Sequence, residues 1–94
     1  MEIDYLGDYS RASSGQDVCI EADITEFGEV ITDNCILTLW SGTDVIYECC
    51  GEYLGDQWAF VIPASVTIEL HGRYFYAVSY GGEYIDVRQP ITII

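Results

Sequence analysis

Apolar and polar residues alternate with a period of two along much of this chain, between short clusters of Gly, Asp, Asn and Ser. The clearest case is "DVCIEADIT" at 17–25, where Val18, Ile20, Ala22 and Ile24 alternate with polar neighbours or cysteine. Successive side chains of a β-strand point to opposite faces, so this pattern predicts a strand with one buried face. Because helical periodicity is hard to find anywhere, the chain is predicted to be all-β.

Further strands are predicted where short apolar runs are bounded by turn residues. They cover residues 2–6, 35–40, 45–50, 57–63, 73–80, 83–87 and 89–94. The link at 64–72 suits a crossover between sheets with a helical turn, and Gly81 and Gly82 predict a tight hairpin turn. About seven short strands favour an immunoglobulin-like β-sandwich of antiparallel strands. We expect one domain over residues 1–94, with a small β-barrel as the alternative fold.

The charge balance is strongly acidic, with 16 Asp and Glu, three arginines and no lysine, for a formal net charge of −13. This disfavours direct binding to nucleic-acid phosphates and to anionic membrane surfaces. The opening "MEIDYLGDYS" has no apolar signal segment, and no run reaches the roughly 20 residues of a membrane span. We therefore expect synthesis in a cytoplasm, with the four cysteines reduced.

The residues that could carry chemistry do not form a pattern typical of an active site. The single histidine, His71, could pair with Cys49 or Cys50, but nothing in the spacing supplies an oxyanion hole or an orienting third group. Zinc-ligand spacing and a phosphate-binding loop are missing. Loop carboxylates such as Asp4 and Asp8 keep calcium binding as an alternative, although no loop has the residue order of an EF-hand. We expect neither an enzyme nor a bound cofactor.

Several predicted strands carry large apolar side chains on both faces. In "RYFYAVSY", Tyr74 and Tyr76 fall on one face and Phe75 on the other. A sandwich has one dry face per sheet, so the surplus predicts a surface that another molecule covers. The candidate contact residues are Trp40, Phe75, Ile93 and Ile94. An unpaired apolar last strand would also be an edge to which another chain can add. The alternative is that these four residues are ordinary core or rim residues.

The order of motifs resembles the small immunoglobulin-like β-sandwich modules of tailed-bacteriophage virion proteins. The resemblance is carried by "DYLGDYS", "DVCIEADITEFGEVITD", "ILTLWSGTDVI", "GEYLGDQWAFVIPASVTIELHGRYFYAV" and "RQPITI". The matching positions are Gly7, Asp8, Trp58, Phe60, Pro63, Thr67, Leu70, Gly72, Tyr74 and Tyr76. Tyr76 stands where an antibody domain has its second cysteine, so the disulfide of that family is missing.

This resemblance implies a non-enzymatic structural or accessory protein of the virion, as a head decoration or as a tail or baseplate component. Its partners would be other virion proteins or its own copies in a homo-oligomer. The alternative is an inhibitor that mimics nucleic acid, with Asp17, Glu21 and Asp23 as an outward carboxylate stripe. Such residues recur at multiples of roughly 6.6 Å along a strand, and the stripe could occupy a phosphate-binding channel.

Overall fold

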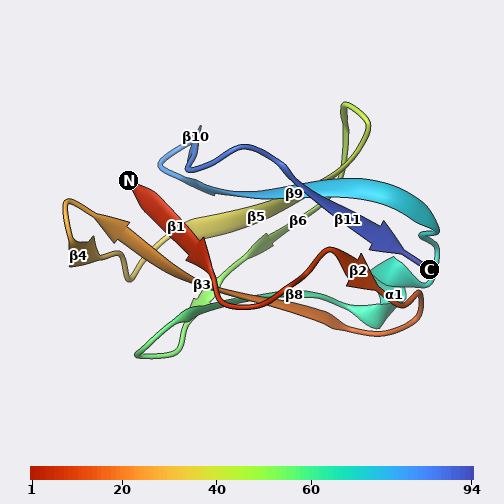
Figure 1. Ribbon diagram of the computed structural model, residues 1–94, viewed down its shortest axis with the longest axis horizontal. Coiled ribbons are helices and arrows are strands. Elements are labelled where there is room, and N and C mark those ends of the chain that lie inside the picture. The colour runs from red at the N-terminus through yellow and green to blue at the C-terminus, as the bar shows by residue number, and fades with distance from the viewer.

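The computed structural model describes all 94 residues and consists almost entirely of strands in two stacked sheets (Figure 1). The first sheet contains, in order, β1 (Glu2–Tyr5), β3 (Val18–Glu26), β8 (Trp58–Ile62) and β7 (Glu52–Tyr53), with β4 (Glu29–Val30) paired to β3. The second contains β2 (Arg11–Ala12), β11 (Gln89–Ile93), β9 (Gly72–Tyr80), β5 (Cys35–Ser41) and β6 (Asp44–Cys50), with β10 (Glu83–Tyr84) paired to β9. The predicted all-β sandwich is confirmed, and no barrel closes.

The strand order is that of an immunoglobulin-like sandwich. In that arrangement the first, second, fifth and fourth strands form one sheet, while the third, sixth and seventh form the other. Here β1, β3, β8 and β7 stand in the first set, and β5, β9 and β11 stand in the second. The remaining strands, β2, β4, β6 and β10, extend these two sheets at their edges and ends.

The core lies between the sheets and is built from the inward side of each alternating strand. Along β3 the side chains of Val18, Ile20, Ala22 and Ile24 are buried while their neighbours face outward, as the sequence predicts. The buried hydrophobic cluster is Val18, Ile20, Ala22, Ile24, Cys35, Leu37, Leu39, Trp58, Phe60, Ile62, Tyr76, Val78, Ile91 and Ile93. Both sheets contribute to it, which holds them face to face.

The inward aromatic row of β9 also fixes the turn before that strand. Tyr76 is buried, and Tyr74 and Tyr80 pack against the core from the same face. The Tyr74 hydroxyl donates to the carbonyl oxygen of His71 and accepts from the His71 N–H, each at 3.1 Å. A tyrosine that bonds to backbone a few residues upstream is the tyrosine corner of immunoglobulin-like sandwiches.

The crossover from β8 to β9 is tied to the loop before β3 by one buried threonine. Pro63 ends β8, and the chain forms the short helix α1 (Ala64–Thr67) in the predicted link. The Thr67 hydroxyl donates to the Gln16 carbonyl oxygen at 2.7 Å and accepts from the Gly15 N–H at 3.2 Å. A buried hydroxyl needs such partners.

The last strand is not the free edge that the sequence suggests. Two residues between the first two predicted strands form β2, which pairs with β11 in parallel, at Arg11 opposite Thr92 and Ala12 opposite Ile93. The expectation of only antiparallel strands is wrong at this pair. Because β2 covers the outer edge of β11, the chain's apolar end is already paired within one molecule.

Tyr5 and Tyr76 pack their rings together at the edge of the core. Their rings meet edge to face, with centroids 5.4 Å apart. Burial raises the pKa of Tyr76 to about 12, with the charges of Tyr9 and Asp8 adding to it. Burial also raises the pKa of Tyr5, and the Tyr76 and Asp86 charges act in the same direction.

These shifts predict a loss of stability at high pH. Below the ordinary tyrosine pKa of 10.0 both states keep the proton, whereas above it the unfolded chain releases its proton first. The free energy of unfolding should therefore fall as pH rises from about 10 to about 12. Tyr76→Phe should make the fall shallower in urea titrations across this range, with the exposed Tyr84→Phe as control. An unchanged slope in Tyr76→Phe would contradict the assignment.

Gly51 lies where no side chain fits, and this allows a second test, of the packing around it. An added Cβ would lie 2.4 Å from Phe60 Cε1 and 2.8 Å from Trp58 Cε3. Overpacking of this kind lowers the free energy of unfolding by about 1–3 kcal/mol. Gly51→Ala should lose that amount of stability, measured as a lower urea midpoint. Adding Phe60→Leu makes room, and the double variant should lose less than the two single losses combined. Strict additivity would show that no clash exists.

Candidate interaction surfaces

Trp40 and Phe75 are direct neighbours on the outer face of the second sheet, paired across β5 and β9. The sequence places both outward correctly, yet Trp40 is only 7% exposed. The Tyr84 ring packs against it with centroids 5.2 Å apart, and the Arg88 guanidinium lies 5.4 Å from its ring centre. Trp40 is therefore covered by its own chain, and its prediction as a partner contact is wrong.

Arg88 acts as a strap across this outer face. Its Nη1 donates to the Gly42 carbonyl oxygen in the β5–β6 turn at 2.6 Å. On the way its guanidinium lies 4.7 Å from the ring centre of Phe75. Phe75 is half-buried and has Arg73 as a second cation, 5.8 Å from the ring centre. The ring therefore stays partly accessible between two guanidinium groups.

The other two predicted contact residues lie elsewhere. Ile93 is 1% exposed and belongs to the core, so its prediction as a contact residue is wrong. Ile94 is 60% exposed, but its backbone is held, since its N–H bonds to the Ala12 carbonyl and its carbonyl accepts from the Ser14 N–H. The structure thus brings together Trp40 and Phe75 but not these two isoleucines.

All three arginines of the chain lie on this outer face of the second sheet, which we call the arginine–aromatic face. Arg11 and Arg73 both stand opposite Thr92, on strands that flank β11. Paired residues share a face, and the inward neighbours of Thr92 are the core residues Ile91 and Ile93. The face is defined by Arg11, Trp40, Arg73, Phe75 and Arg88.

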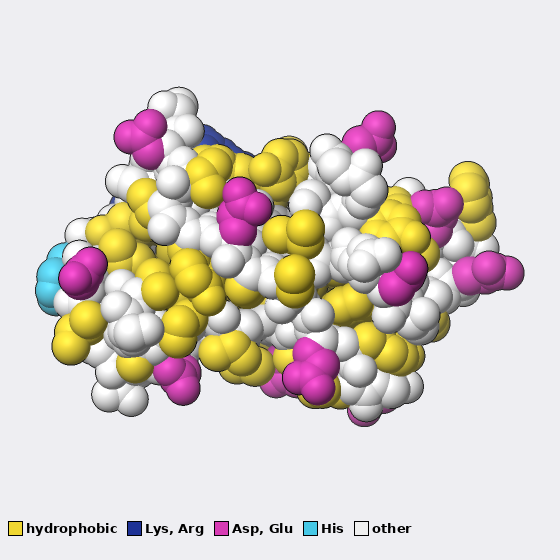
Figure 2. All heavy atoms as spheres, turned by 180° about the vertical axis from the view of Figure 1, so that it is seen from behind, with side chains coloured by type: hydrophobic (Ala, Val, Ile, Leu, Met, Phe, Trp, Pro, Cys, Tyr) yellow, Lys and Arg dark blue, Asp and Glu magenta, His cyan; other side chains and the backbone are white.

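The predicted carboxylate stripe is only partly assembled. Asp17 accepts the Ala64 N–H at 2.7 Å, which gives it a structural role at the start of α1. Glu21 and Asp23 do lie on the outer side of β3. Asp4 of β1 stands directly opposite Asp23, although like charges in that arrangement repel. Figure 2 shows acidic side chains scattered among hydrophobic ones on the far side of the molecule.

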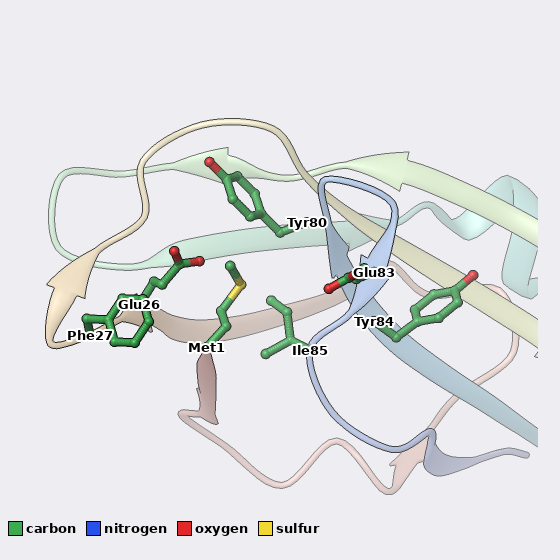
Figure 3. Close-up of a pocket in the computed structure, with 7 residues that line it drawn as sticks. All are labelled: Met1, Glu26, Phe27, Tyr80, Glu83, Tyr84 and Ile85. Carbon is green, nitrogen blue, oxygen red and sulfur yellow. The ribbon is translucent and has the colours of Figure 1, made fainter.

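A groove of about 380 Å³ opens at one end of the sandwich, between the turn that follows β3 and the β9–β10 hairpin (Figure 3). We call it the acidic groove; it is lined by Met1, Glu26, Phe27, Tyr80, Glu83, Tyr84 and Ile85. In Figure 3 the Met1 and Ile85 side chains lie between Glu26 and Glu83, with the Tyr80 ring above them. The Asp33 carboxylate, with smaller effects of desolvation and Glu26, raises the pKa of Tyr80.

None of the seven groove residues is predicted from the sequence, and Phe27 is the one whose sequence context carried a signal. It is 97% exposed and has a φ of 52°, and Gly28 follows with a φ of 80°. Two positive φ values make the tight turn between β3 and β4, and a phenylalanine is a costly choice there. The pair Phe-Gly between Glu26 and Glu29 was the available signal, since an aromatic residue before a turn glycine has no buried strand face to fill.

The cysteines remain free thiols, of which Cys19 and Cys50 are exposed. Burial raises the pKa of the Cys35 thiol to about 11, with the Asp33 charge adding to it. Burial likewise raises the pKa of Cys49, so thiolate is disfavoured at both positions. No group of three or more His, Cys, Asp and Glu side chains is placed to hold a metal ion.

No protein-family model matches the chain. No curated protein matches it either. The single helix is also too short to cross a bilayer.

The strap predicts a fluorescence change in Arg88→Ala. Losing the guanidinium uncovers the Trp40 ring, so acrylamide should quench tryptophan emission more strongly than in the wild type. Cation–π contacts at exposed sites contribute about 0.5–1 kcal/mol each, and the variant should lose stability of that order. Arg11→Ala, which removes a cation from the same face without touching Trp40, is the control. Unchanged quenching in Arg88→Ala would refute the strap.

Proposed function

We propose that this protein is a non-enzymatic structural or accessory component of a tailed-bacteriophage virion, as a head decoration or a tail or baseplate part. It acts by binding its own copies or other virion proteins. It is synthesised in the host cytoplasm and ends in the particle. The resemblance of its motifs to virion β-sandwich modules supports the class of protein, and the arginine–aromatic face supports binding as its action.

The observation that carries binding is the placement of the cations. A chain with 16 acidic residues has three arginines, and all three lie on one face. Their partners within the chain are the rings of Trp40 and Phe75 and one backbone carbonyl, with no carboxylate among them. Arg11 and Arg73 therefore keep their donors available to carboxylates of another molecule. Arginine beside an aromatic ring is also the composition of interface hot spots.

The residues that carry the resemblance have structural roles, so their shared pattern is explained by the fold and needs no catalytic site. Trp58 and Phe60 stack in the core, Thr67 ties the crossover, and Tyr74 forms the corner before β9. They build the sandwich and leave its outer faces free to differ. Partner choice therefore depends on residues between the matching positions, such as Arg73 and Phe75.

The second candidate is an inhibitor that mimics nucleic acid. The outer face of the first sheet favours it, because Asp4, Glu21, Asp23 and Glu52 all lie there, on β1, β3 and β7. Asp17 contributes less than the sequence indicates, since its carboxylate is bonded to backbone. A surface of this kind would bind a basic channel with an affinity that falls steeply with salt.

Mass spectrometry of virions purified from the encoding phage tests the proposal. We expect the protein in the particle, and we expect Arg73→Glu to lower its copy number there by at least about tenfold, as loss of an interface anchor does. Asp23→Asn, on the other sheet, is the control and should leave the copy number unchanged. Absence of the wild-type protein from virions would overturn the proposal and favour the inhibitor.

A further inference from the structure

The two ends of the long axis carry opposite chemistry. β9 connects them, from Arg73 near one end to Tyr80 at the other, a span of about 23 Å at about 3.3 Å per residue. Tyr80 lines the acidic groove with Glu26 and Glu83. Arg73 shares the opposite end with Arg11, and we call this pair the arginine end. In Figure 1 the β10 hairpin and β2 mark these two ends.

Neither end is neutralised within the molecule. The Arg73 guanidinium lies 5.8 Å from the centre of the Phe75 ring, and no salt bridge joins Arg73, Glu26 or Glu83 to another side chain. The groove offers what a guanidinium needs, with carboxylates that accept its N–H donors and aromatic rings on which its plane can stack. A volume of about 380 Å³ leaves room for such side chains.

Phe27 adds an independent reason to expect a partner at the groove. Its ring is almost wholly exposed, and its backbone is in the left-handed region that phenylalanine disfavours. Both features cost stability in the isolated chain and concern the same groove wall. Strained backbone of this kind tends to persist at binding sites, where a ligand recovers what the free protein loses.

We infer that copies of this protein associate head to tail, with Arg11 and Arg73 of one copy docked in the acidic groove of the next. The inference rests on the proposed function and names the second copy as the partner. The second copy fits because one chain carries both the donors and the acceptors, at opposite ends. A head-to-tail contact is heterologous, so it repeats into a ring or a filament. Repulsion between copies of net charge −13 is screened beyond about 8 Å at physiological salt.

Two charge-reversed variants test this contact by light scattering and sedimentation at about 0.15 M salt. One reverses the groove, Glu26→Arg with Glu83→Arg, and the other reverses the arginine end, Arg11→Glu with Arg73→Glu. Wild-type protein should assemble beyond a dimer, and each variant alone should stay monomeric. An equimolar mixture of the two should assemble again, because every contact then joins opposite charges.

A control variant and a second groove variant separate docking from folding. Asp23→Arg with Glu52→Arg changes the net charge as much as the groove reversal does, but on the outer face of the first sheet, and it should still assemble. Phe27→Gly suits the left-handed turn, so the monomer should keep or gain stability in urea. It should nevertheless weaken assembly by at least about tenfold, because the groove loses one wall.

A monomeric wild type, or a mixture that fails to assemble, would overturn the inference. Assembly as strong as that of the wild type, either in Phe27→Gly or in the groove-reversed variant, would also overturn the inference. These results are independent of the virion measurement. A monomer that is found in virions would end the head-to-tail contact and leave the proposed function intact, while a protein that assembles but is absent from virions would do the reverse.

Discussion

The strict alternation of inward and outward side chains along β3 and β9 is the constraint on which the rest of the structure depends. Tyr74, Tyr76 and Val78 enter the core, and this alone puts Arg73 and Phe75 on the opposite face. A slip of one residue would exchange these sets and expose the core. The register therefore fixes the arginine–aromatic face and the core at once, so neither can be rearranged without the other.

The second sheet is covered outside by the same chain that builds it. Arg88 crosses from the segment before β11 to the β5–β6 turn, and Tyr84 closes on Trp40 from the β9–β10 hairpin. Only part of the apolar surplus thus remains for a partner. What stays accessible on this face combines the arginines and the half-buried Phe75 ring with the exposed Val45 of β6, so charge as well as apolar area would select a partner.

How much the sequence predicts depends on whether a signal is local. The long strands and the Gly81–Gly82 turn were predictable, because period-two patterns and turn residues act over a few positions. The two-residue strands β2 and β7 have no period to detect. The parallel pairing of β2 with β11 joins residues some eighty positions apart, which no local pattern encodes.

The same limit explains the candidate contact residues. Trp40 was correctly placed outward, yet its cover comes from Arg88, far along the chain. Ile93 alternates with Thr92 and falls inward with Ile91, so its burial follows from the strand pattern once β11 is known to line the core. Phe27 lies in a turn, where no alternation announces its exposure. Interfaces thus depend on tertiary neighbours more than strands do.

The positions of the two termini have a consequence for longer polypeptides. Met1 lines the groove at one end of the molecule, and Ile94 is bonded beside β2 at the other (Figure 1). Copies of this module joined in one polypeptide would extend end to end instead of folding back on one another. Each linker would then join the arginine end of one copy to the acidic-groove end of the next, so tandem duplication would connect these two ends covalently.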